Sequence, residues 1–411
     1  MSLKRQTIAR KVRRFDKTLN KRAQETYSEL LRVFVKDLPP GVSDVVLGFL
    51  KSKDYVGLIE WADSSCSAVQ ATAFDYFNAS QLAALIKKFG AAERQCRRYN
   101  LKLRTFKSKY VPELVALTKM AAFISRVIGE KPDFDAIYSR CGFGPGASIG
   151  VHGNSTNLAR KLLADQWSCT PSALPYAAES VCRDHHLFEL MSRRDGRYYS
   201  MDPQELREEF KRRTRLVHYN KIVTVPKTAL VDRTIAVEPL WNGYLQKGVD
   251  EYFRLCLKRV GLDLRDQSRN QELARQGSIP GQADPYVTID LSNASDSISL
   301  SLAKRVLPPE WFSFLDAIRS PAYLLPGSDE AVRYEKFVSM GNGFCFPLET
   351  LIFASVCALY SKPKDFVVYG DDIICRQSVA AKVIKTLWAI GFRHNTKKTF
   401  LEGPFRESCG A

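Results

Sequence analysis

The stretch "FVVYGDDIIC", from Phe366 to Cys375, places two adjacent carboxylates between two short apolar runs. Both runs are rich in β-branched residues, so they predict two short strands. Gly370 and Asp371 suit the turn of a tight hairpin, because glycine accepts the positive φ of a primed turn. Two interpretations of the acids are open: an ordinary hairpin with solvated side chains, or a metal site. Asp372 favours a metal site, since a charge that enters an apolar strand must be solvated, paired or bound to a cation.

A second source of carboxylate lies in "YVTIDLSNASDSISLSLAKRVL", residues 286–307. Its first four residues predict a strand that ends at Asp290, and sheets of mixed folds build sites just beyond such strand ends. Asp290 therefore lies beside the Asp371 turn if the two strands are neighbours in one sheet. Ser292–Ser295 offers capping residues for a following helix. Asp296 lies at the start of that helix, where a capping role and a contact with substrate are both open.

Three carboxylates around one point repel one another, and their pKa values rise unless cations balance the charge. Two Mg²⁺ ions about 3.5 to 4 Å apart would do so, and would clamp the attacking and leaving oxygens of an in-line phosphoryl transfer. Magnesium prefers oxygen ligands, which fits the lack of His and Cys clusters with zinc spacing in the sequence. Asp290, Asp371 and Asp372 therefore point to nucleotidyl transfer.

The segment "SMGNGFCFPLETLIFASVCALY", residues 339–360, supplies a further candidate contact. Gly341, Asn342 and Gly343 predict a flexible turn, and the mostly apolar residues after it predict a buried helix. Such a turn at a helix start can approach a backbone phosphate or a ribose closely. A purely structural turn is the competing interpretation, and the tripeptide taken alone favours it.

Four basic residues are candidates for handling phosphate. Lys227 and Arg233, in a β-rich region at 220–239, can neutralise the triphosphate of an incoming nucleotide. Lys397 and Lys398 can include a general acid that protonates departing pyrophosphate. Taken alone, Lys227 and Arg233 are more typical of surface cations, and a solvated pair is at least as typical of Lys397 and Lys398.

The composition is that of a globular protein with a basic surface. The 411 residues are 45% hydrophobic and include 61 Lys and Arg against 44 Asp and Glu, which gives a formal charge of +17. This charge favours polyanionic partners, either nucleic acid or an acidic membrane surface. Residues 1–22 form a basic arm, interpreted as a phosphate-contacting extension, a solvated tail or a transit peptide. No segment is long and apolar enough to predict a membrane span.

The chain divides into parts that differ in their predicted secondary structure. Residues 40–135 predict helices, and "CGFGPGASIG" at 141–150 predicts a loop that can approach phosphates or form a structural turn. Residues 150–200 predict an irregular, loop-rich region. Two β-rich segments at 220–239 precede a predicted helix at 241–260.

These pieces, in this order, resemble the right-hand polymerases, and specifically the replicase subunit of single-stranded RNA bacteriophages of the Qβ type. The resemblance rests on six segments: "GFGPGAS", "VPKTALVDRTIAVEP", "VTIDLSNASDSIS", "MGNGF..LETLIFAS", "VVYGDDII" and "KKTF.EGPFRESCG". By average residue usage, YGDD alone arises by chance in fewer than about one in a hundred chains of this length, and the ordered set is far more specific. The resemblance covers residues 140–411 strongly and the basic helical start only in general character.

The resemblance implies an α+β fold of the right-hand type, with helix-rich fingers, an antiparallel-sheet palm, and a thumb that is incomplete or absent. Residues 1–140 are then a basic helical N-terminal region of the fingers, and residues 141–284 are fingers with a nucleotide-phosphate-binding segment. Residues 285–411 are the palm, with an insertion of the fingers near 317–338.

The resemblance assigns a role to each candidate site residue. Asp290 and Asp371 resemble the principal metal ligands, and Asp372 resembles an adjacent ligand or a support of the metal site. Lys227 and Arg233 resemble the phosphate-binding pair of the fingers. Asp296 and Asn342 are candidate nucleotide contacts, and Asn342 resembles a position that contacts nucleotide or template. Gly341 and Gly343 are candidate contacts with the template or its backbone.

The implied activity is RNA-templated RNA synthesis with two Mg²⁺ ions, in which an RNA 3′-hydroxyl attacks the α-phosphate of an NTP and pyrophosphate leaves. The family acts in the cytoplasm of a bacterial host, away from membranes, and recruits host elongation factors Tu and Ts and a ribosomal protein. The chain stops at "PFRESCGA", where the family would continue into more of its palm and thumb. A catalytically inactive, truncated RNA-binding fragment is therefore the alternative, beside a reverse transcriptase or a Mg²⁺ phosphohydrolase.

Overall fold

The computed structural model describes residues 48, 67–104, 111–152, 157–164, 166–194, 197–198, 202–228 and 231–410. Its contacts divide the chain into two compact units. The larger unit comprises Gly90–Ile222, Ile235–Leu324 and Ala331–Ala411, and the smaller unit includes Val223–Thr234 and Leu325–Glu330. The basic arm at residues 1–22 lies outside the described residues.

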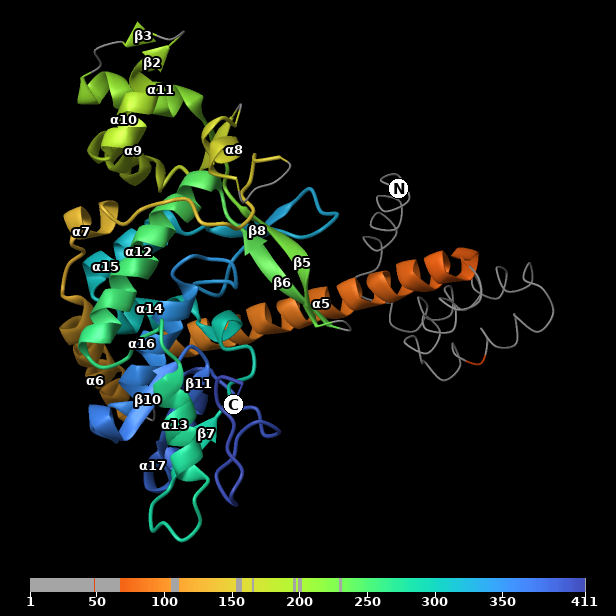
Figure 1. The fold of residues 1–411 in the computed structure, drawn as a ribbon, viewed down its shortest axis with the longest axis vertical. Coiled ribbons are helices and arrows are strands. Elements are labelled where there is room, and N and C mark those ends of the chain that lie inside the picture. The colour runs from red at the N-terminus through yellow and green to blue at the C-terminus, as the bar shows by residue number, and fades with distance from the viewer. Residues whose placement is uncertain are drawn as a thin grey trace. The chain divides into compact units, whose positions relative to one another are not determined.

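Helices and strands are mixed along the described chain, which confirms the α+β class (Figure 1). The helices are α5 (Ser67–Arg104), α6 (Val111–Ile128), α7 (Phe134–Tyr138), α8 (Leu158–Leu162), α9 (Leu174–Arg183), α10 (His185–Ser192), α11 (Pro203–Arg213), α12 (Leu240–Arg259), α13 (Ser268–Gly277), α14 (Leu300–Val306), α15 (Pro309–Ile318), α16 (Cys345–Cys357) and α17 (Gln377–Ile390). The strands are β1 (Trp167–Cys169), β2 (Arg193–Arg194), β3 (Arg197–Tyr198), β4 (Thr214–Leu216), β5 (Asn220–Thr228), β6 (Val231–Val237), β7 (Tyr286–Ile289), β8 (Ala322–Leu324), β9 (Ala331–Arg333), β10 (Phe366–Tyr369) and β11 (Asp372–Arg376). Among the described helices, none combines the length and the apolar composition that crossing a membrane requires.

Three short antiparallel strands form the sheet that contains the YGDD motif, in the order β10–β11–β7. β10 pairs with β11 around a two-residue turn of Gly370 and Asp371. β11 also pairs with β7, with Ile373 opposite Ile289. The predicted hairpin, the predicted strand before Asp290 and the adjacency of the two are therefore confirmed.

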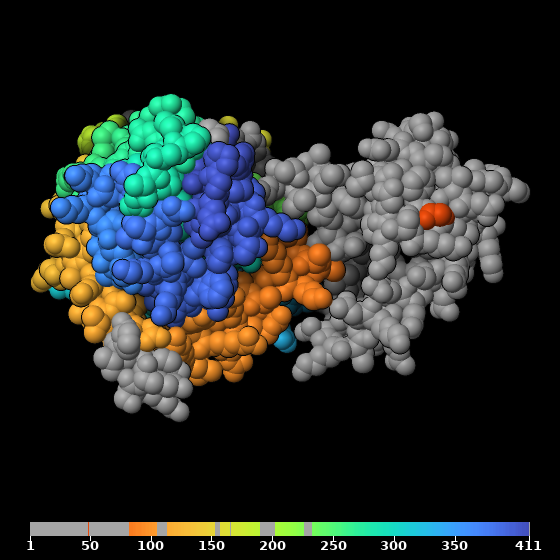
Figure 2. All heavy atoms as spheres, turned by 90° about the horizontal axis from the view of Figure 1, so that it is seen from below, coloured from red at the N-terminus to blue at the C-terminus, as the bar shows by residue number. Residues whose placement is uncertain are grey.

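Helix α16 forms the centre of the larger unit and is buried along almost its whole length, as its apolar sequence predicts. It packs against α6, α12 and α17 and against strand β10 (Figure 1). Helix α13 packs against β7 and β10. Figure 2 shows the region of α13 in teal next to the blue residues of the C-terminal part on one continuous surface. Because burial of apolar surface is the main force that stabilises folds, this packing holds the small sheet in place.

A second sheet has the strand order β6–β5–β8–β9, and its strands β5 and β6 confirm the two β-rich segments predicted at 220–239. At its start β5 pairs in parallel with β8, with Asn220 opposite Tyr323. The Asn220 amide donates to the buried carboxylate of Glu238 at 2.9 Å, and the Tyr334 hydroxyl donates to Asn220 Oδ1 at 2.7 Å. These bonds satisfy buried polar groups that would otherwise destabilise the fold.

Two expectations about local structure are wrong. Residues 150–200, expected to be loop-rich, contain the short helices α8, α9 and α10. The helix after Asp290 is capped by Ser299, whose Oγ accepts a hydrogen bond from Leu302 N at 3.3 Å, and not by a residue of Ser292–Ser295. The last residue of that cluster, Ser295, begins a 3₁₀ turn, Ser295–Ser297, that precedes the helix. The expected domain boundaries stay predictions.

Substituting Gly370 by alanine should destabilise the protein, because two costs combine there. Gly370 has a φ of +60°, and a Cβ added to it would lie 2.3 Å from a ring carbon of Phe346. We expect Gly370→Ala to lower the free energy of unfolding by about 2 to 4 kcal/mol, as measured by urea denaturation. Gly403→Ala is the matched control, since Gly403 has a φ of +72° but no atom within 4 Å of the added Cβ. Equal losses in the two variants would contradict a specific role for the Phe346 contact.

Candidate active site

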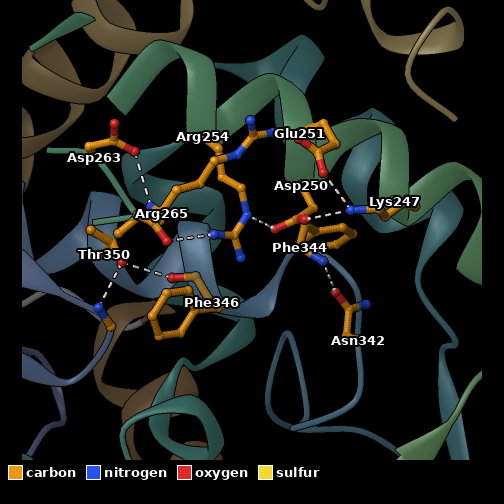
Figure 3. Close-up of polar contacts among 12 residues, drawn as sticks. Lys247, Asp250, Glu251, Arg254, Asp263, Arg265, Asn342, Phe344, Phe346 and Thr350 are labelled. Atoms are coloured by element: carbon orange, nitrogen blue, oxygen red, sulfur yellow. Dashed lines mark hydrogen bonds and ion pairs between the residues drawn. The ribbon is translucent and has the colours of Figure 1, made fainter. Parts of the chain in front are cut away.

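The turn that carries Asp371 is held by α16. Gly370 N donates to Thr350 Oγ1 at 3.0 Å, and the Thr350 hydroxyl donates to the carbonyl oxygen of Phe346 at 2.9 Å, one helical turn earlier (Figure 3). Positive φ at Gly370 but not at Asp371 is typical of a type II′ hairpin turn. The Phe346 ring packs edge-on against Tyr369, with the centroids 5.1 Å apart. The position of the turn is therefore set by the helix behind it.

The Phe346 ring is itself held by charged residues of α12 (Figure 3). The guanidinium of Arg254 lies 5.6 Å from the centroid of that ring, and a cation over an aromatic face is attractive. Arg254 Nε donates to Asp250 at 2.8 Å, and Lys247 lies 3.5 Å from the same carboxylate. Arg254 therefore connects the ion pairs of α12 to the Phe346 ring, which restricts Gly370.

Asp290, Asp371 and Asp372 gather at one end of the β10–β11–β7 sheet. The register of β7 and β11, extended by one residue, places Asp290 opposite Asp372. Burial raises the pKa of Asp290, and the neighbouring charge of Asp371 raises it further. The pKa of Asp372 is also raised, mainly by burial, with a contribution from Asp290. The structure thus brings together the three acids that the sequence analysis selected.

Two residues near the C-terminal end of the chain support these carboxylates. Asn395 donates from Nδ2 to Asp290 Oδ2 at 2.9 Å and from its backbone N to the Asp290 carbonyl at 2.8 Å. The backbone N of Cys409 donates to Asp372 Oδ2 at 3.0 Å. These bonds favour the ionised carboxylates and offset part of the effect of burial. The sequence analysis assigned a role to neither residue, because only the tertiary structure brings them to the acids.

Glu349 is a fourth acid at the site, and the sequence analysis did not select it. It lies on α16 with 3% of its surface exposed, and Ser295 Oγ donates to its Oε2 at 2.9 Å. Burial raises the pKa of Glu349 to about 8, and the charge of Asp371 contributes to the shift. A signal was present in the sequence: a lone charged residue inside an otherwise apolar predicted helix.

Asp296 is paired with a buried lysine. The fully buried Nζ of Lys336 lies 2.8 Å from Asp296 Oδ1 and 3.7 Å from Glu93 Oε1. Burial raises the pKa of Glu93, while the charge of Lys336 acts in the opposite direction. Asp296 is therefore the partner of a buried cation and does not cap the following helix. Its contact with nucleotide stays a prediction.

Gly341, Asn342 and Gly343 form a tightly packed turn at the start of α16. Gly341 has a φ of +107°, and a Cβ there would lie 2.3 Å from a carbonyl oxygen of β6. Gly343 N donates to Gln246 Oε1 at 2.9 Å, and the buried Asn342 accepts from Phe344 N at 3.1 Å (Figure 3). These contacts support the structural interpretation of the turn. Contact of these residues with nucleotide or template stays a prediction.

The predicted basic residues fall into two groups. Lys397 and Lys398 are both exposed, and the charge of Lys398 lowers the pKa of Asp290. Lys398 is therefore the member of this pair that the structure connects to the acids. Lys227 lies on β5 and Arg233 on β6, in the smaller compact unit. Their grouping with the acids stays a prediction.

The glycine-rich loop at 141–150 is held by a buried lysine. Lys161 Nζ donates to the carbonyl oxygens of Gly144 and Gly146, the latter at 2.8 Å. Burial lowers the pKa of Lys161. The loop thus turns carbonyl oxygens toward a cation at these two positions, which supports a structural turn more than a cradle of amides around a phosphate.

The donor chemistry of the three aspartates fits magnesium. All their donors are carboxylate oxygens, which Mg²⁺ prefers. Within the part of the chain that the structure describes, no group of three or more His, Cys, Asp or Glu side chains is already arranged as a metal cage. The raised pKa values of Asp290 and Asp372 come from burial and from neighbouring carboxylates, and a bound cation would relieve both effects.

Replacing Lys336 measures how much its ion pair with Asp296 contributes to the free energy of unfolding. Lys336→Met leaves Asp296 without its fully buried cation in a partly buried setting, and we expect the free energy of unfolding to fall by about 3 to 5 kcal/mol. Adding Asp296→Asn should restore part of the loss, because the unpaired charge is removed. Lys382→Met on the exposed face of α17 is the control and should change stability by less than about 0.5 kcal/mol. Urea unfolding of all four proteins measures this, and a small loss for Lys336→Met would contradict the interpretation.

Stability should depend on pH through Glu349. Its pKa of about 8 in the folded chain lies above the value of about 4.3 for an unfolded glutamate. Between these values the folded state binds a proton that the unfolded state has released, so this contribution to stability is lost as pH rises. Glu349→Gln should therefore become more stable, relative to the unsubstituted chain, from about pH 5 to pH 8.5 in thermal melts. The exposed control Glu402→Gln should show a constant difference, and a constant difference for Glu349→Gln would contradict the prediction.

Comparison with known proteins gives a consistent result over most of the chain. Residues 70–411 match the family described as RNA replicase, beta-chain. The chain is 37% identical over 336 residues to the RNA-directed RNA polymerase subunit beta of Qbeta virus (strain MX1), covering 79% of this chain and 52% of the relative. It is 39% identical over 339 residues to the subunit beta of Enterobacteria phage SP, covering 80% and 54%. It is 42% identical over 280 residues to the RNA-directed RNA polymerase beta chain of Escherichia phage MS2, covering 67% and 48%.

The extent of these matches confirms the resemblance seen in the six sequence segments. The chain spans about half the length of the relatives that it matches. The matched range contains the sheet, α16 and the three aspartates described above. The chain belongs to the RNA replicase beta-chain family.

Proposed function

We propose that this chain contains the catalytic centre of an RNA-directed RNA polymerase, which synthesises RNA on an RNA template. The observation that supports this most directly is the β10–β11–β7 sheet, which places Asp290 beside Asp371 and Asp372. The relatives of the chain are named RNA-directed RNA polymerase subunits. The right-hand layout, with this sheet and α16 in the palm, is part of the same proposal.

Asp290 and Asp371 would hold two Mg²⁺ ions, with Asp372 as an adjacent ligand or support. When bound, the ions supply a lowered pKa for the RNA 3′-hydroxyl and stabilise the charge of the triphosphate. The chain's own residues position the acids beforehand: Asn395 orients Asp290, and Thr350 holds the turn next to Asp371. Such preorganisation matters because carboxylates that must move during a reaction stabilise a transition state less well.

Four basic residues would handle the phosphates. Lys227 and Arg233 would bind the triphosphate of the incoming NTP, as cations do in phosphoryl transfer. Lys397 or Lys398 would protonate the leaving pyrophosphate. Lys398 is favoured because its charge acts on Asp290.

The remaining candidates would position the substrates. Lys336 keeps the Asp296 carboxylate in one place, which would suit a contact with the nucleotide. Asn342 would contact nucleotide or template, and Gly341 and Gly343 would let the backbone come close to the template.

The family resemblance also supports a set of partners for the whole protein. These are the RNA template and product, NTPs, host elongation factors Tu and Ts, and a ribosomal protein. The site of action would be the cytoplasm of the bacterial host, because the relatives come from bacteriophages.

A templated extension assay tests the proposed activity. The protein is incubated with an RNA template, labelled NTPs and Mg²⁺, with and without host elongation factors. We expect Asp371→Asn to lower the extension rate roughly a hundred- to a thousandfold, because a metal ligand contributes several kcal/mol to the transition state. Chelation of Mg²⁺ should abolish extension, and dNTPs should replace NTPs poorly.

Asp365→Asn, at the other end of β10, removes the same charge and should leave the extension rate nearly unchanged. Full activity of Asp371→Asn would exclude Asp371 as a ligand. If the unsubstituted chain binds RNA but never extends it, even with host factors present, the proposed activity is wrong for this chain.

A further inference from the structure

One cavity in the larger unit is lined by residues other than the three aspartates. Its volume is about 620 Å³, within the range of roughly 300 to 1,000 Å³ that is typical of ligand sites. Its walls come from α8, from β1 and β4, from the start of β5 and from the residues around Gly150. Val217 and Ser168 are buried in these walls, so the cavity has a fixed floor.

The walls of this cavity carry positive charge, and no carboxylate of the described residues lines it. Arg160, Arg215 and Lys221 line it and are exposed, and His152 lies beside them. Among the residues that the structure describes, those that line the cavity include no Asp or Glu. Arg215 and Lys221 form no ion pair with any residue that the structure describes. Cations without a partner among the described residues repel one another, and a bound phosphate group would remove that cost.

One aromatic side chain completes the cavity. Tyr219 is half-buried in the wall between Arg215 and Lys221 along the chain. Among the described residues, it makes no ring contact and its hydroxyl makes no hydrogen bond. An aromatic face that is flanked by cations is the arrangement that binds single-stranded nucleic acid, with a base stacked on the ring and phosphates held by the charges.

The geometry points to a binding site for a segment of single-stranded RNA in this cavity. Arg160, Arg215 and Lys221 hold backbone phosphates, and Tyr219 stacks against a base. RNA is the polyanion that suits this chain, because the chain belongs to the RNA replicase beta-chain family and carries a formal charge of +17. The site is separate from Asp290 and does not depend on catalysis.

The basic wall is tested with the double variant Arg215→Gln/Lys221→Gln. Its affinity for a labelled single-stranded RNA of about twelve nucleotides is measured by fluorescence anisotropy at several KCl concentrations. We expect binding about tenfold weaker at low salt, and a slope of log Kd against log salt concentration that falls by about 1.4, since each lost phosphate contact removes about 0.7. Lys382→Gln/Lys385→Gln on α17 removes the same charge from an exposed surface and should alter neither quantity appreciably.

The aromatic contact is tested at Tyr219. Tyr219→Ala should weaken RNA binding by roughly fivefold or more, while Tyr219→Phe keeps the ring and should bind like the unsubstituted chain. Ultraviolet crosslinking of the same RNA should attach it to the peptide that contains Tyr219. Thermal melts of each variant show whether it is folded.

Three results would overturn the proposed RNA site. Equal weakening by the α17 control would mean that only the overall charge of the protein matters. Displacement of the RNA crosslink by millimolar ATP, with no effect of RNA length, would identify a mononucleotide site. Unchanged affinity of the variants together with no crosslink at Tyr219 would place the RNA elsewhere. Because the measurement is binding and not extension, a failure of the proposed polymerase activity leaves this test intact.

Discussion

The contact between α16 and the Gly370 turn is the interaction on which the candidate active site depends. Thr350 Oγ1 accepts a hydrogen bond from Gly370 N, and the Phe346 ring fills the space where a side chain at position 370 would lie. Because α16 is buried among α6, α12 and α17, it transmits the rigidity of the core to the turn. A two-residue turn on a small sheet would otherwise be free to move, and its carboxylates with it.

Repulsion between partly buried carboxylates is the second constraint, and hydrogen bonds from several residues offset it. Asp290 and Asp372 are partly buried beside other acids, so their pKa values rise. Asn395 and the Cys409 amide stabilise the ionised forms from one side. Glu349, behind the site, has a pKa of about 8 because it is buried near Asp371. Such an arrangement is least strained when a cation is bound, which links the structure of the site to its proposed use.

Buried lysines serve as structural cations elsewhere in the larger unit. Lys336 pairs with Asp296 and Glu93, and Lys161 satisfies carbonyl oxygens of the glycine-rich loop. In both places a candidate ligand-binding motif is held in a single conformation by an internal charge. The exposed cations around Tyr219 differ, because in the described part of the chain no acid lines their cavity.

Local patterns in the sequence were sufficient for the hairpin, the strand before Asp290, the apolar α16 and the three aspartates, because each depends on short-range periodicity or on a turn residue. The family also followed from ordered motifs. The tertiary structure alone revealed Glu349 at the site, the pairing of Asp296 with Lys336 and the support from Asn395, since these contacts join residues at least 40 positions apart. It also showed short helices in the region 150–200 that was expected to be loop-rich, and helices of this length are stabilised mainly by packing against the rest of the fold.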